Sequence, residues 1–235
     1  HSNVTLSNPF ANLRVFIQQN GRQDNMIKGL KPIFVKDKEL VYDYDEDNVF
    51  DGNNEYRFFD FKSFNYKTMN IQSYSKDDTT NYVELKYDEK RTYKNYYSAN
   101  DLNGRYVVDF ENGNDPDLDA DYGYVHFQLK YHDVIAGGDL YVFGGLSDWK
   151  FTDECKMTWN DSLGVYETEV YLKQGYYNYH YVLLKDEKQT GNVSFIEGTH
   201  FETENEYTIF VYYVDPTERY ERLIGVKTFN SIKGR

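Results

Sequence analysis

Short runs of alternating apolar and polar residues cover most of this chain, and clusters of Asn, Asp and Gly interrupt them. Alternation places successive side chains on opposite faces of a strand, and turn residues spaced about 8 to 12 positions apart are typical of β-sandwiches. No helix of useful length is predicted, because the remaining segments are rich in β-branched and aromatic residues. We therefore predict an all-β protein with strands at 13–19, 32–35, 39–44, 55–61, 69–73, 82–87, 105–110, 122–129, 139–143, 157–159, 165–172, 176–184, 207–214 and 221–229.

One polar segment interrupts this series of strands near the middle of the chain. Residues 111–121, ENGNDPDLDAD, have no apolar face and include a Pro and a Gly. Such a composition is typical of a linker between domains of ordinary size. We therefore predict two tandem immunoglobulin-like β-sandwich domains, with residues 1–115 in the first and 116–235 in the second.

Alternation in two of the predicted strands indicates which side chains form the core. In 122–129, the apolar residues Val125, Phe127 and Leu129 share one face, so this face is expected to be buried. The strand at 176–184 carries aromatic or apolar residues on both faces. Such a strand is either central in its sheet or covered by neighbouring parts of the protein.

Charge and the lack of long apolar runs exclude several classes of protein. The 235 residues carry a formal net charge of −13, which repels polyanions, so nucleic acid is not an expected partner. No apolar run approaches the ~18 residues of a membrane-spanning helix. The single cysteine, Cys155, excludes an internal disulfide. The chain starts without Met and without a recognisable export signal, so we expect a trimmed piece of a longer protein.

The sequence lacks the motifs that would indicate catalysis or a metal centre. It contains no GxSxG, no HExxH and no Gly-rich phosphate loop, and its five histidines lack the spacing of zinc ligands. Asp115, Asp117, Asp119 and Asp121 alternate, as calcium ligands do. Counted from Asp115 or from Asp117, however, no Gly stands sixth and no Glu twelfth, as an EF-hand loop requires. We therefore expect no enzymatic activity, no cofactor and no metal ion.

The stretch 138–184 contains GDLYVFGGLSDWKF and then GVYETEVYLKQGYYNYHYVLL. It resembles the early-set, glycogen-binding β-sandwich module that precedes the barrel of glycogen-branching enzymes and occurs in the β-subunit of AMP-activated kinase. The resemblance implies an early-set domain and a candidate glucan-stacking platform at Trp149. Those modules usually carry a second Trp in a later turn, which here reads LLKDEKQTG. Two alternatives follow: Trp149 binds a glycan, or it packs over the end of the sandwich.

Further segments appear in the order QQNGRQDNMIKGLKPIFV, ELVYDYDEDNVFDGNNEYRFFDFKSF, ADYGYVHFQL and TENEYTIFVYYVDPTERYERLIGVKTFNS. Together they resemble the plug protein family of the type IX secretion system, from about residue 8 to residue 231. The resemblance implies a non-enzymatic periplasmic protein at the inner side of the outer membrane, where it blocks a large barrel translocon. Members of that family also carry a further N-terminal β domain. We expect the isolated chain to be monomeric.

The segment 51–61, DGNNEYRFFDF, combines a turn, an arginine and several aromatic residues. Aromatic and arginine side chains are enriched in protein interfaces. We therefore select Tyr56, Arg57 and Phe59, together with Trp149, as candidate binding residues. The alternative is that the aromatic residues of this strand belong to the core.

Overall fold

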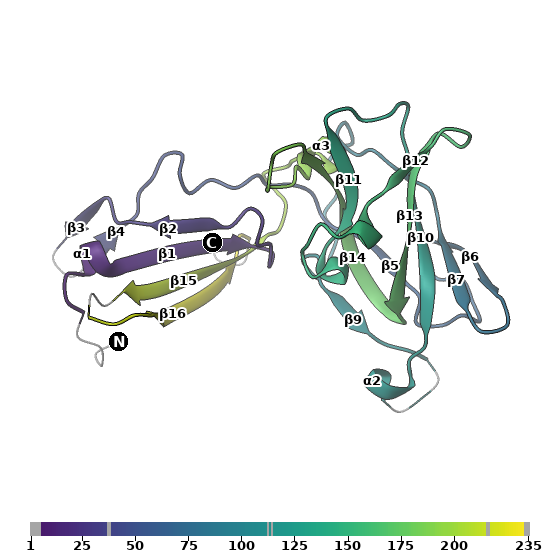
Figure 1. Cartoon of the computed structure of the whole chain (residues 1–235), viewed down its shortest axis with the longest axis horizontal. Helices are drawn as coiled ribbons and strands as arrows, with labels where there is room; N and C mark the ends of the chain where they lie inside the picture. Colours follow the sequence, from purple (N-terminus) through teal and green to yellow (C-terminus); the bar gives the residue numbers. More distant parts are fainter. Residues whose placement is uncertain (1–5, 37–38, 112, 114, 215–216, 233–235) are drawn as a thin grey trace. The chain divides into compact units, whose positions relative to one another are not determined.

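The structure, a computed structural model, describes residues 6–36, 39–111, 113, 115–214 and 217–232. Its regular structure consists almost entirely of strands, so the prediction of an all-β protein is confirmed (Figure 1). In the described part of the chain, no helix has the length and apolar character needed to span a membrane. The helices are single turns: α1 (Pro9–Asn12), α2 (Pro116–Asp119), α3 (Ser194–Glu197), and the 3-10 turns η1 (Gly145–Ser147) and η2 (Asp153–Cys155).

The chain divides into two compact units. Unit 1 comprises His1–Asp51 and Glu204–Arg235, and unit 2 comprises Gly52–Thr203. Unit 1 is therefore assembled from the two ends of the chain, whereas unit 2 is one continuous stretch.

Unit 1 contains an antiparallel four-stranded sheet in the order β16-β15-β1-β2. β1 pairs with β15 over its whole length, from Leu13 opposite Tyr213 to Gln19 opposite Tyr207. A small hairpin of β3 and β4 completes the unit. The strands of unit 1 are β1 (Leu13–Gln19), β2 (Ile27–Leu30), β3 (Phe34–Lys36), β4 (Glu39–Val41), β15 (Glu206–Val214) and β16 (Glu221–Asn230).

Unit 2 contains a six-stranded and a four-stranded sheet (Figure 1). One runs in the order β12-β13-β10-β7-β6, with β8 beside β10, and the other in the order β11-β14-β5, with β9 beside β14. The strands are β5 (Arg57–Asp60), β6 (Ile71–Lys76), β7 (Asn81–Leu85), β8 (Asp88–Glu89), β9 (Tyr106–Val108), β10 (Tyr122–Lys130), β11 (Gly138–Phe143), β12 (Thr158–Asn160), β13 (Val165–Lys173) and β14 (Gly175–Lys185).

The core of unit 2 lies between these two sheets. Val125, Phe127 and Leu129 of β10 are completely buried, as their shared face predicts. They belong to one apolar cluster with alternate side chains of β14, namely Tyr177, Tyr179 and Tyr181. The opposite face of β14 is buried too, and β14 lies between β11 and β5. On this second face, His180 stacks on Tyr56 and Val182 packs with Phe143 and Val193, so the aromatic and apolar residues of β14 are covered on both sides.

The division into units differs from the predicted one. Residues on either side of the predicted boundary at 115 and 116 belong to unit 2, because β7 and β10 pair in parallel, with Val83 opposite Val125. The polar segment 111–121 predicted as a linker instead includes the α2 turn within unit 2. Its composition marks a loop, and a loop composition alone does not distinguish a domain linker from a long connection.

Most predicted strands coincide with observed ones, but β2 was not predicted. Its sequence, IKGL, contains Gly29 at a φ of +70°, and the pairing of β2 with β1 shifts register between Val15 and Ile17. A glycine with positive φ in a strand is typical of a bulge. The bulge breaks the alternation on which the prediction depends.

Candidate functional site

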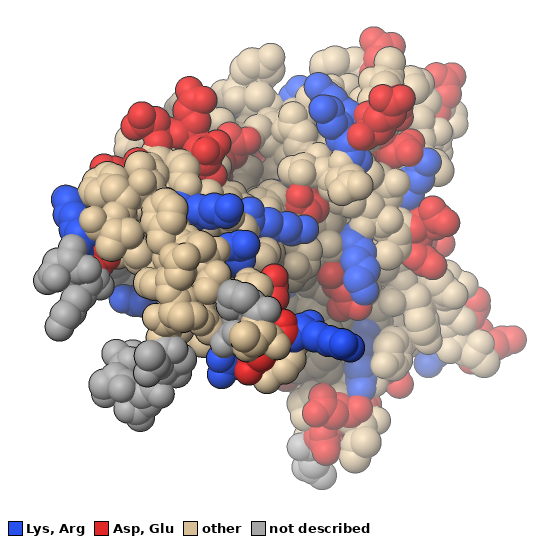
Figure 2. Space-filling view, turned by 60° about the vertical axis from the view of Figure 1, so that its left-hand side comes forward, with Lys and Arg blue, Asp and Glu red and all other residues tan. Residues whose placement is uncertain are grey.

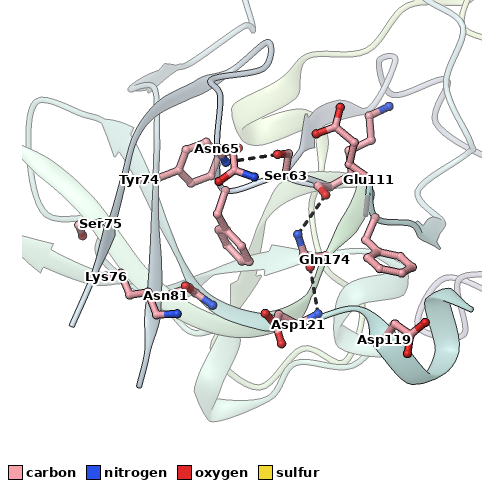
Figure 3. A pocket seen from close by; sticks show the side chains of 13 residues that line it. Ser63, Asn65, Tyr74, Ser75, Lys76, Asn81, Glu111, Asp119, Asp121 and Gln174 are labelled. Atoms are coloured by element: carbon pink, nitrogen blue, oxygen red, sulfur yellow. Dashed lines mark hydrogen bonds between the residues drawn. The ribbon is translucent and has the colours of Figure 1, made fainter. Parts of the chain in front are cut away.

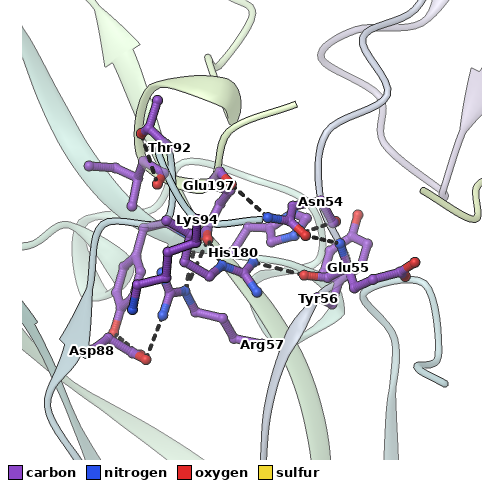
Figure 4. Close-up of polar contacts among 12 residues, drawn as sticks. Asn54, Glu55, Tyr56, Arg57, Asp88, Thr92, Lys94, His180 and Glu197 are labelled. Carbon is purple, nitrogen blue, oxygen red and sulfur yellow. Dashed lines mark hydrogen bonds and ion pairs between the residues drawn. The ribbon is translucent and has the colours of Figure 1, made fainter. Parts of the chain in front are cut away.

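Buried charged side chains gather where β5, β14 and α3 meet in unit 2 (Figure 4). Glu197 at the end of α3 has no exposed surface. Its carboxylate accepts hydrogen bonds from Nε of Arg57 at 3.0 Å, from Nε of Arg91 at 2.7 Å and from the backbone N–H of Tyr181 at 2.9 Å. Ile196, also fully buried, anchors α3 in the core and so places the neighbouring carboxylate inside the unit.

Arg57 connects this carboxylate to a second one. Its Nη1 donates to Asp88 at 2.6 Å, and its Nη2 donates to the backbone carbonyl of Glu89 at 2.7 Å. Asp88 also accepts hydrogen bonds from the hydroxyls of Tyr179 at 2.6 Å and Tyr181 at 2.9 Å. We call Arg57, Asp88, Arg91 and Glu197 the ionic cluster.

The environment of the ionic cluster shifts the pKa of the Glu197 carboxyl and of two neighbouring tyrosine hydroxyls. Burial alone would raise the pKa of the Glu197 carboxyl, but the charges of Arg57, Arg91 and His180 hold that pKa well below its usual range. Burial and the neighbouring carboxylate of Asp88 raise the pKa values of Tyr179 and Tyr181 well above their usual value. General acid-base catalysis needs a group whose pKa lies near the working pH. These groups do not meet that condition, so the ionic cluster is best explained as a structural element that joins β5, β8, β14 and α3.

The depressed pKa of Glu197 predicts a loss of stability in acid. Because the pKa is lowered on folding, the carboxylate stabilises the folded state at pH values above its ordinary pKa of 4.5. That contribution is lost progressively as the pH falls below this value. We expect the free energy of unfolding, measured by urea titration at a series of pH values, to decrease from about pH 4.5 downward. The 13C resonance of the Glu197 carboxyl is expected not to titrate before the protein unfolds; titration near pH 4.5 in the folded state contradicts the prediction.

A pocket of about 460 Å³ opens beside the ionic cluster. Its lining carries four basic side chains, Arg57, Lys86, Arg91 and Lys94, and two carboxylates, Glu55 and Asp88. Two further carboxylates outside the lining offset part of this positive charge: Glu89 pairs with Lys94 at 3.2 Å, and Glu197 pairs with both arginines. Its lining consists of Asn54, Glu55, Tyr56, Arg57, Phe58, Asn70, Lys86, Tyr87, Asp88, Arg91, Lys94, Asn95, Tyr97, Ala99 and Tyr179.

A second pocket, also of about 460 Å³, lies elsewhere in unit 2 and has a different character (Figure 3). Gln174, only 6% exposed, stands at its centre and gives it the name Gln174 pocket. Amides, hydroxyls, carboxylates and aromatic rings face the same space. The lining consists of Lys62, Ser63, Phe64, Asn65, Tyr74, Ser75, Lys76, Asn81, Phe110, Glu111, Asp119, Asp121 and Gln174.

Four tyrosines form a row across the outer face of the larger sheet of unit 2. Tyr124 on β10 lies opposite Tyr82 on β7 and Tyr171 on β13. The ring centroids are 5.9 Å apart for Tyr82 and Tyr124, 4.8 Å for Tyr124 and Tyr171, and 5.2 Å for Tyr171 and Tyr122. Tyr122, Tyr124 and Tyr171 are 46%, 38% and 56% exposed. We call these four residues the tyrosine row.

Comparison with known proteins gives one informative similarity. A hypothetical protein from Parabacteroides merdae ATCC 43184, with a crystal structure at 2.30 Å resolution, is 35% identical in sequence and superposes with a TM-score of 0.93. The similarity covers 98% of this chain but only 58% of that protein, so this chain spans little more than half the length of its relative. No family model matches the sequence. No curated protein matches it either.

The structure places three of the candidate binding residues inside unit 2. Phe59 has no exposed surface and stacks on Tyr177, with ring centroids 5.3 Å apart. A side chain at this position contributes to the core and has no surface with which to contact a partner, which corrects the prediction for Phe59. Tyr56 is 5% exposed and stacks on His180 at 3.8 Å, while Arg57 belongs to the ionic cluster. Tyr56 and Arg57 also belong to the lining of the adjacent pocket.

Trp149 is half-buried and lies in a small apolar cluster at the η1 turn. Its ring packs edge-on against Tyr56 at 6.3 Å and Phe143 at 5.7 Å. A Cβ at Gly104 would come within 2.4 Å of the indole, so the backbone of another loop also approaches the ring closely. These contacts fit the alternative in which Trp149 packs over the end of the sandwich.

Two of the alternating aspartates of 115–121 accept hydrogen bonds from backbone N–H groups at the α2 turn. Asp115 precedes this turn and accepts a hydrogen bond from the backbone N–H of Asp117 at 3.0 Å, and Asp119 accepts one from the N–H of Asp115 at 3.2 Å. Among the residues that the structure describes, no three His, Cys, Asp or Glu side chains are arranged to hold a metal ion.

Sequence reasoning selected only one of the four members of the ionic cluster. Asp88, Arg91 and Glu197 lie in segments without a recognisable motif, and Glu197 is separated from Arg57 by 140 positions. The one local signal is the apolar pair before Glu197 in the sequence SFIEG, which indicates a partly buried turn. Charge partners so far apart in sequence become visible only in the folded structure.

Proposed function

We propose that this protein is a non-enzymatic periplasmic binding protein that associates with a large outer-membrane secretion translocon. The proposal rests on the ordered segments that resemble the type IX plug family over nearly the whole chain. A protein that plugs a channel needs a rigid shape and a surface that binds without being deformed. The proposal therefore requires an exposed contact surface carried on a rigid part of the fold.

The tyrosine row is the observation that best supports such a surface. Tyrosine side chains provide a large contact area with few rotatable bonds, so ordering them at an interface costs little entropy. Here the rings already contact one another, and three regular strands hold them in place. Lys173 adds a positive charge, with its Nζ 5.6 Å from the ring centroid of Tyr122. The row thus offers a preformed, amphipathic surface.

The charge of the protein limits which surface the partner presents. The chain has a net charge of −13, and acidic and basic side chains are interspersed over the face shown in Figure 2. A neutral or basic partner surface fits this charge better than an acidic one. We infer a contact of moderate strength that weakens as the salt concentration rises.

We further propose that unit 2 is an early-set sandwich of the immunoglobulin type. The supporting observations are its two sheets around one core and the position of the resembling stretch, which runs from β11 to β14. A crystal structure of residues 52–203 tests this assignment through the connectivity of its strands.

Copurification from native outer membranes tests the proposed function. We expect the tagged protein to recover a large barrel protein, and the double variant Tyr124→Ser, Tyr171→Ser to recover about tenfold less, because aromatic residues at the centre of an interface carry much of its affinity. The matched control is Tyr93→Ser, Tyr97→Ser, since both residues are highly exposed and lie outside the tyrosine row.

Two results would contradict the proposal at different levels. If the unaltered protein recovers no barrel protein, the proposed association is wrong. If both double variants recover as much barrel protein as the unaltered chain, the association stands but the tyrosine row is not its contact surface.

A further inference from the structure

The Gln174 pocket is held in shape by hydrogen bonds that leave little freedom to its walls. The side chain of Gln174 donates from Nε2 to the carbonyl of Lys62 at 3.0 Å and accepts from the N–H of Asp121 at 2.9 Å. Its backbone N–H donates to the carbonyl of Asp121 at 2.8 Å, and its carbonyl accepts from the N–H of Asp109 at 3.2 Å. One buried residue thus fixes three chain segments around the pocket, which is therefore preformed (Figure 3).

Aromatic rings form the apolar part of the lining. Phe64 packs edge-on against Tyr74, with ring centroids 5.8 Å apart, and also contacts the core through Phe61 at 6.1 Å. Phe110 contributes a third, half-buried ring to the pocket. Burial raises the pKa of the Tyr74 hydroxyl to about 12, so this group stays protonated at neutral pH. The faces of these rings can pack against the C–H groups of a ligand, and polar groups lie beside them.

The polar part of the lining suits a ligand that carries many hydroxyl groups. Asn65, Asn81 and Gln174 contribute amides, and Ser63 and Ser75 contribute hydroxyls. Amides and hydroxyls both donate and accept hydrogen bonds, as sugar hydroxyls do. The Asn81 Nδ2 donates to the carbonyl of Tyr122 at 3.1 Å, which orients this amide within the pocket.

The charges of the lining favour a neutral ligand. The carboxylates of Glu111, Asp119 and Asp121 face two ammonium groups, those of Lys62 and Lys76. A phosphate, a nucleotide or an acidic sugar would meet one more carboxylate than ammonium group in a protein of net charge −13. The volume of about 460 Å³ lies in the ordinary range of small-molecule sites.

We propose that the Gln174 pocket binds a neutral saccharide, with its ring against the aromatic wall and its hydroxyls on the amides and carboxylates. This site is separate from Trp149, which lies outside the lining. It is also independent of the proposed association with a secretion barrel. The saccharide is either a free oligosaccharide or a glycan attached to a protein, since both present the same chemistry.

Nuclear magnetic resonance of the whole chain tests the proposal and locates the site. The probes are neutral tetrasaccharides of glucose, galactose and mannose, and a glycopeptide with one neutral hexose beside the same peptide without sugar. We expect at least one sugar-bearing probe, at up to about 10 mM, to shift the side-chain amide signals of Asn65, Asn81 and Gln174. Shifts with tetrasaccharides indicate a free glycan, and shifts with the glycopeptide alone indicate an attached one.

Substitutions in the lining should weaken this binding while the fold is retained. Asp121→Ala removes an exposed carboxylate, and Phe110→Ala removes part of the aromatic wall. Each is expected to raise the dissociation constant about tenfold. Asp117→Ala is the matched control, because Asp117 is an exposed aspartate on α2 outside the pocket.

Three outcomes would overturn the proposal. The first is that no sugar-bearing probe shifts the three amides, and the second is that the peptide without sugar shifts them as much as the glycopeptide. The third is that the shifts gather at the indole N–H of Trp149 or at the tyrosine row and leave the pocket unchanged. If the Asp121→Ala, Phe110→Ala and control variants bind the sugar-bearing probe with equal affinity, the Gln174 pocket is likewise not its binding site.

Discussion

Replacing Glu197 with glutamine is expected to lower the free energy of unfolding of unit 2 by about 3–5 kcal/mol. The substitution keeps the shape of the side chain but removes its charge. Arg57 and Arg91 then lose the buried carboxylate that both of them contact, and Arg57 is 9% exposed. Arg57 keeps its ion pair with Asp88, and Arg91 keeps the backbone carbonyl of Glu55, but one of the two carboxylates that neutralise these guanidiniums is gone. Uncompensated positive charge in a poorly hydrated site destabilises the folded state strongly.

Tryptophan fluorescence during denaturation by guanidinium chloride is a suitable measurement, because Trp149 and Trp159 both lie in unit 2. Glu89→Gln is the matched control. Its carboxylate pairs with Lys94 at 3.2 Å, but both side chains are more than half exposed, so a change below about 1 kcal/mol is expected. If Glu197→Gln costs no more than this control, the ionic cluster does not stabilise the unit in the way described.

Phe59→Ala is expected to cost a similar amount, about 3–5 kcal/mol, for a different reason. Phe59 has no exposed surface and contacts four other rings. The substitution would leave a cavity that rigid strands on both sides cannot close. The neighbouring rings are those of Phe61, Phe127, Tyr177 and Tyr179.

Phe58→Ala provides the comparison for this prediction. Phe58 is the preceding residue on β5, points to the opposite face and is half-buried against Tyr176 at 5.5 Å. A smaller loss of stability is expected for Phe58→Ala, measured by the same denaturation curves. A Phe59→Ala variant as stable as the unaltered protein, yet unable to recover its membrane partner, would return Phe59 to the role of a binding residue.

The sequence predicted individual strands well where the signal is local. β1 has the predicted bounds, β10 and β13 are each one residue longer than predicted at one end, and β14 is one residue longer at both ends. In these strands the local pattern is long, because residues on one face are more buried than those on the other or because the strand lies between two neighbouring strands. Pairing is not local: β1 pairs with β15, almost 200 positions away, and nothing in either strand identifies the other.

The candidate site could be predicted only in part, because its contacts also join residues that are far apart in the sequence. The aromatic and arginine side chains of 51–61 selected Tyr56, Arg57 and Phe59 as candidates, but the alternation could not show that Phe59 packs against Phe127 of the other sheet. Alternation along β10 puts Tyr124 on the face opposite Val125 and Phe127, whereas its contacts with Tyr82 and Tyr171 depend on the order of three strands. The Gln174 pocket joins segments spread over more than 100 positions, so no short motif could reveal it.

The division of the chain into units has a consequence for the order of events during synthesis. All strands of unit 2 are made before β15, so unit 2 can form before the sheet of unit 1 is complete. β1 can pair with β2 soon after both are made, but on its other edge it has to wait for β15, and closing so long a loop is slow. Until then the edge of β1 that β15 will cover carries unpaired backbone groups. A chaperone that holds extended segments would thus have a substrate in β1 although β1 belongs to the smaller unit.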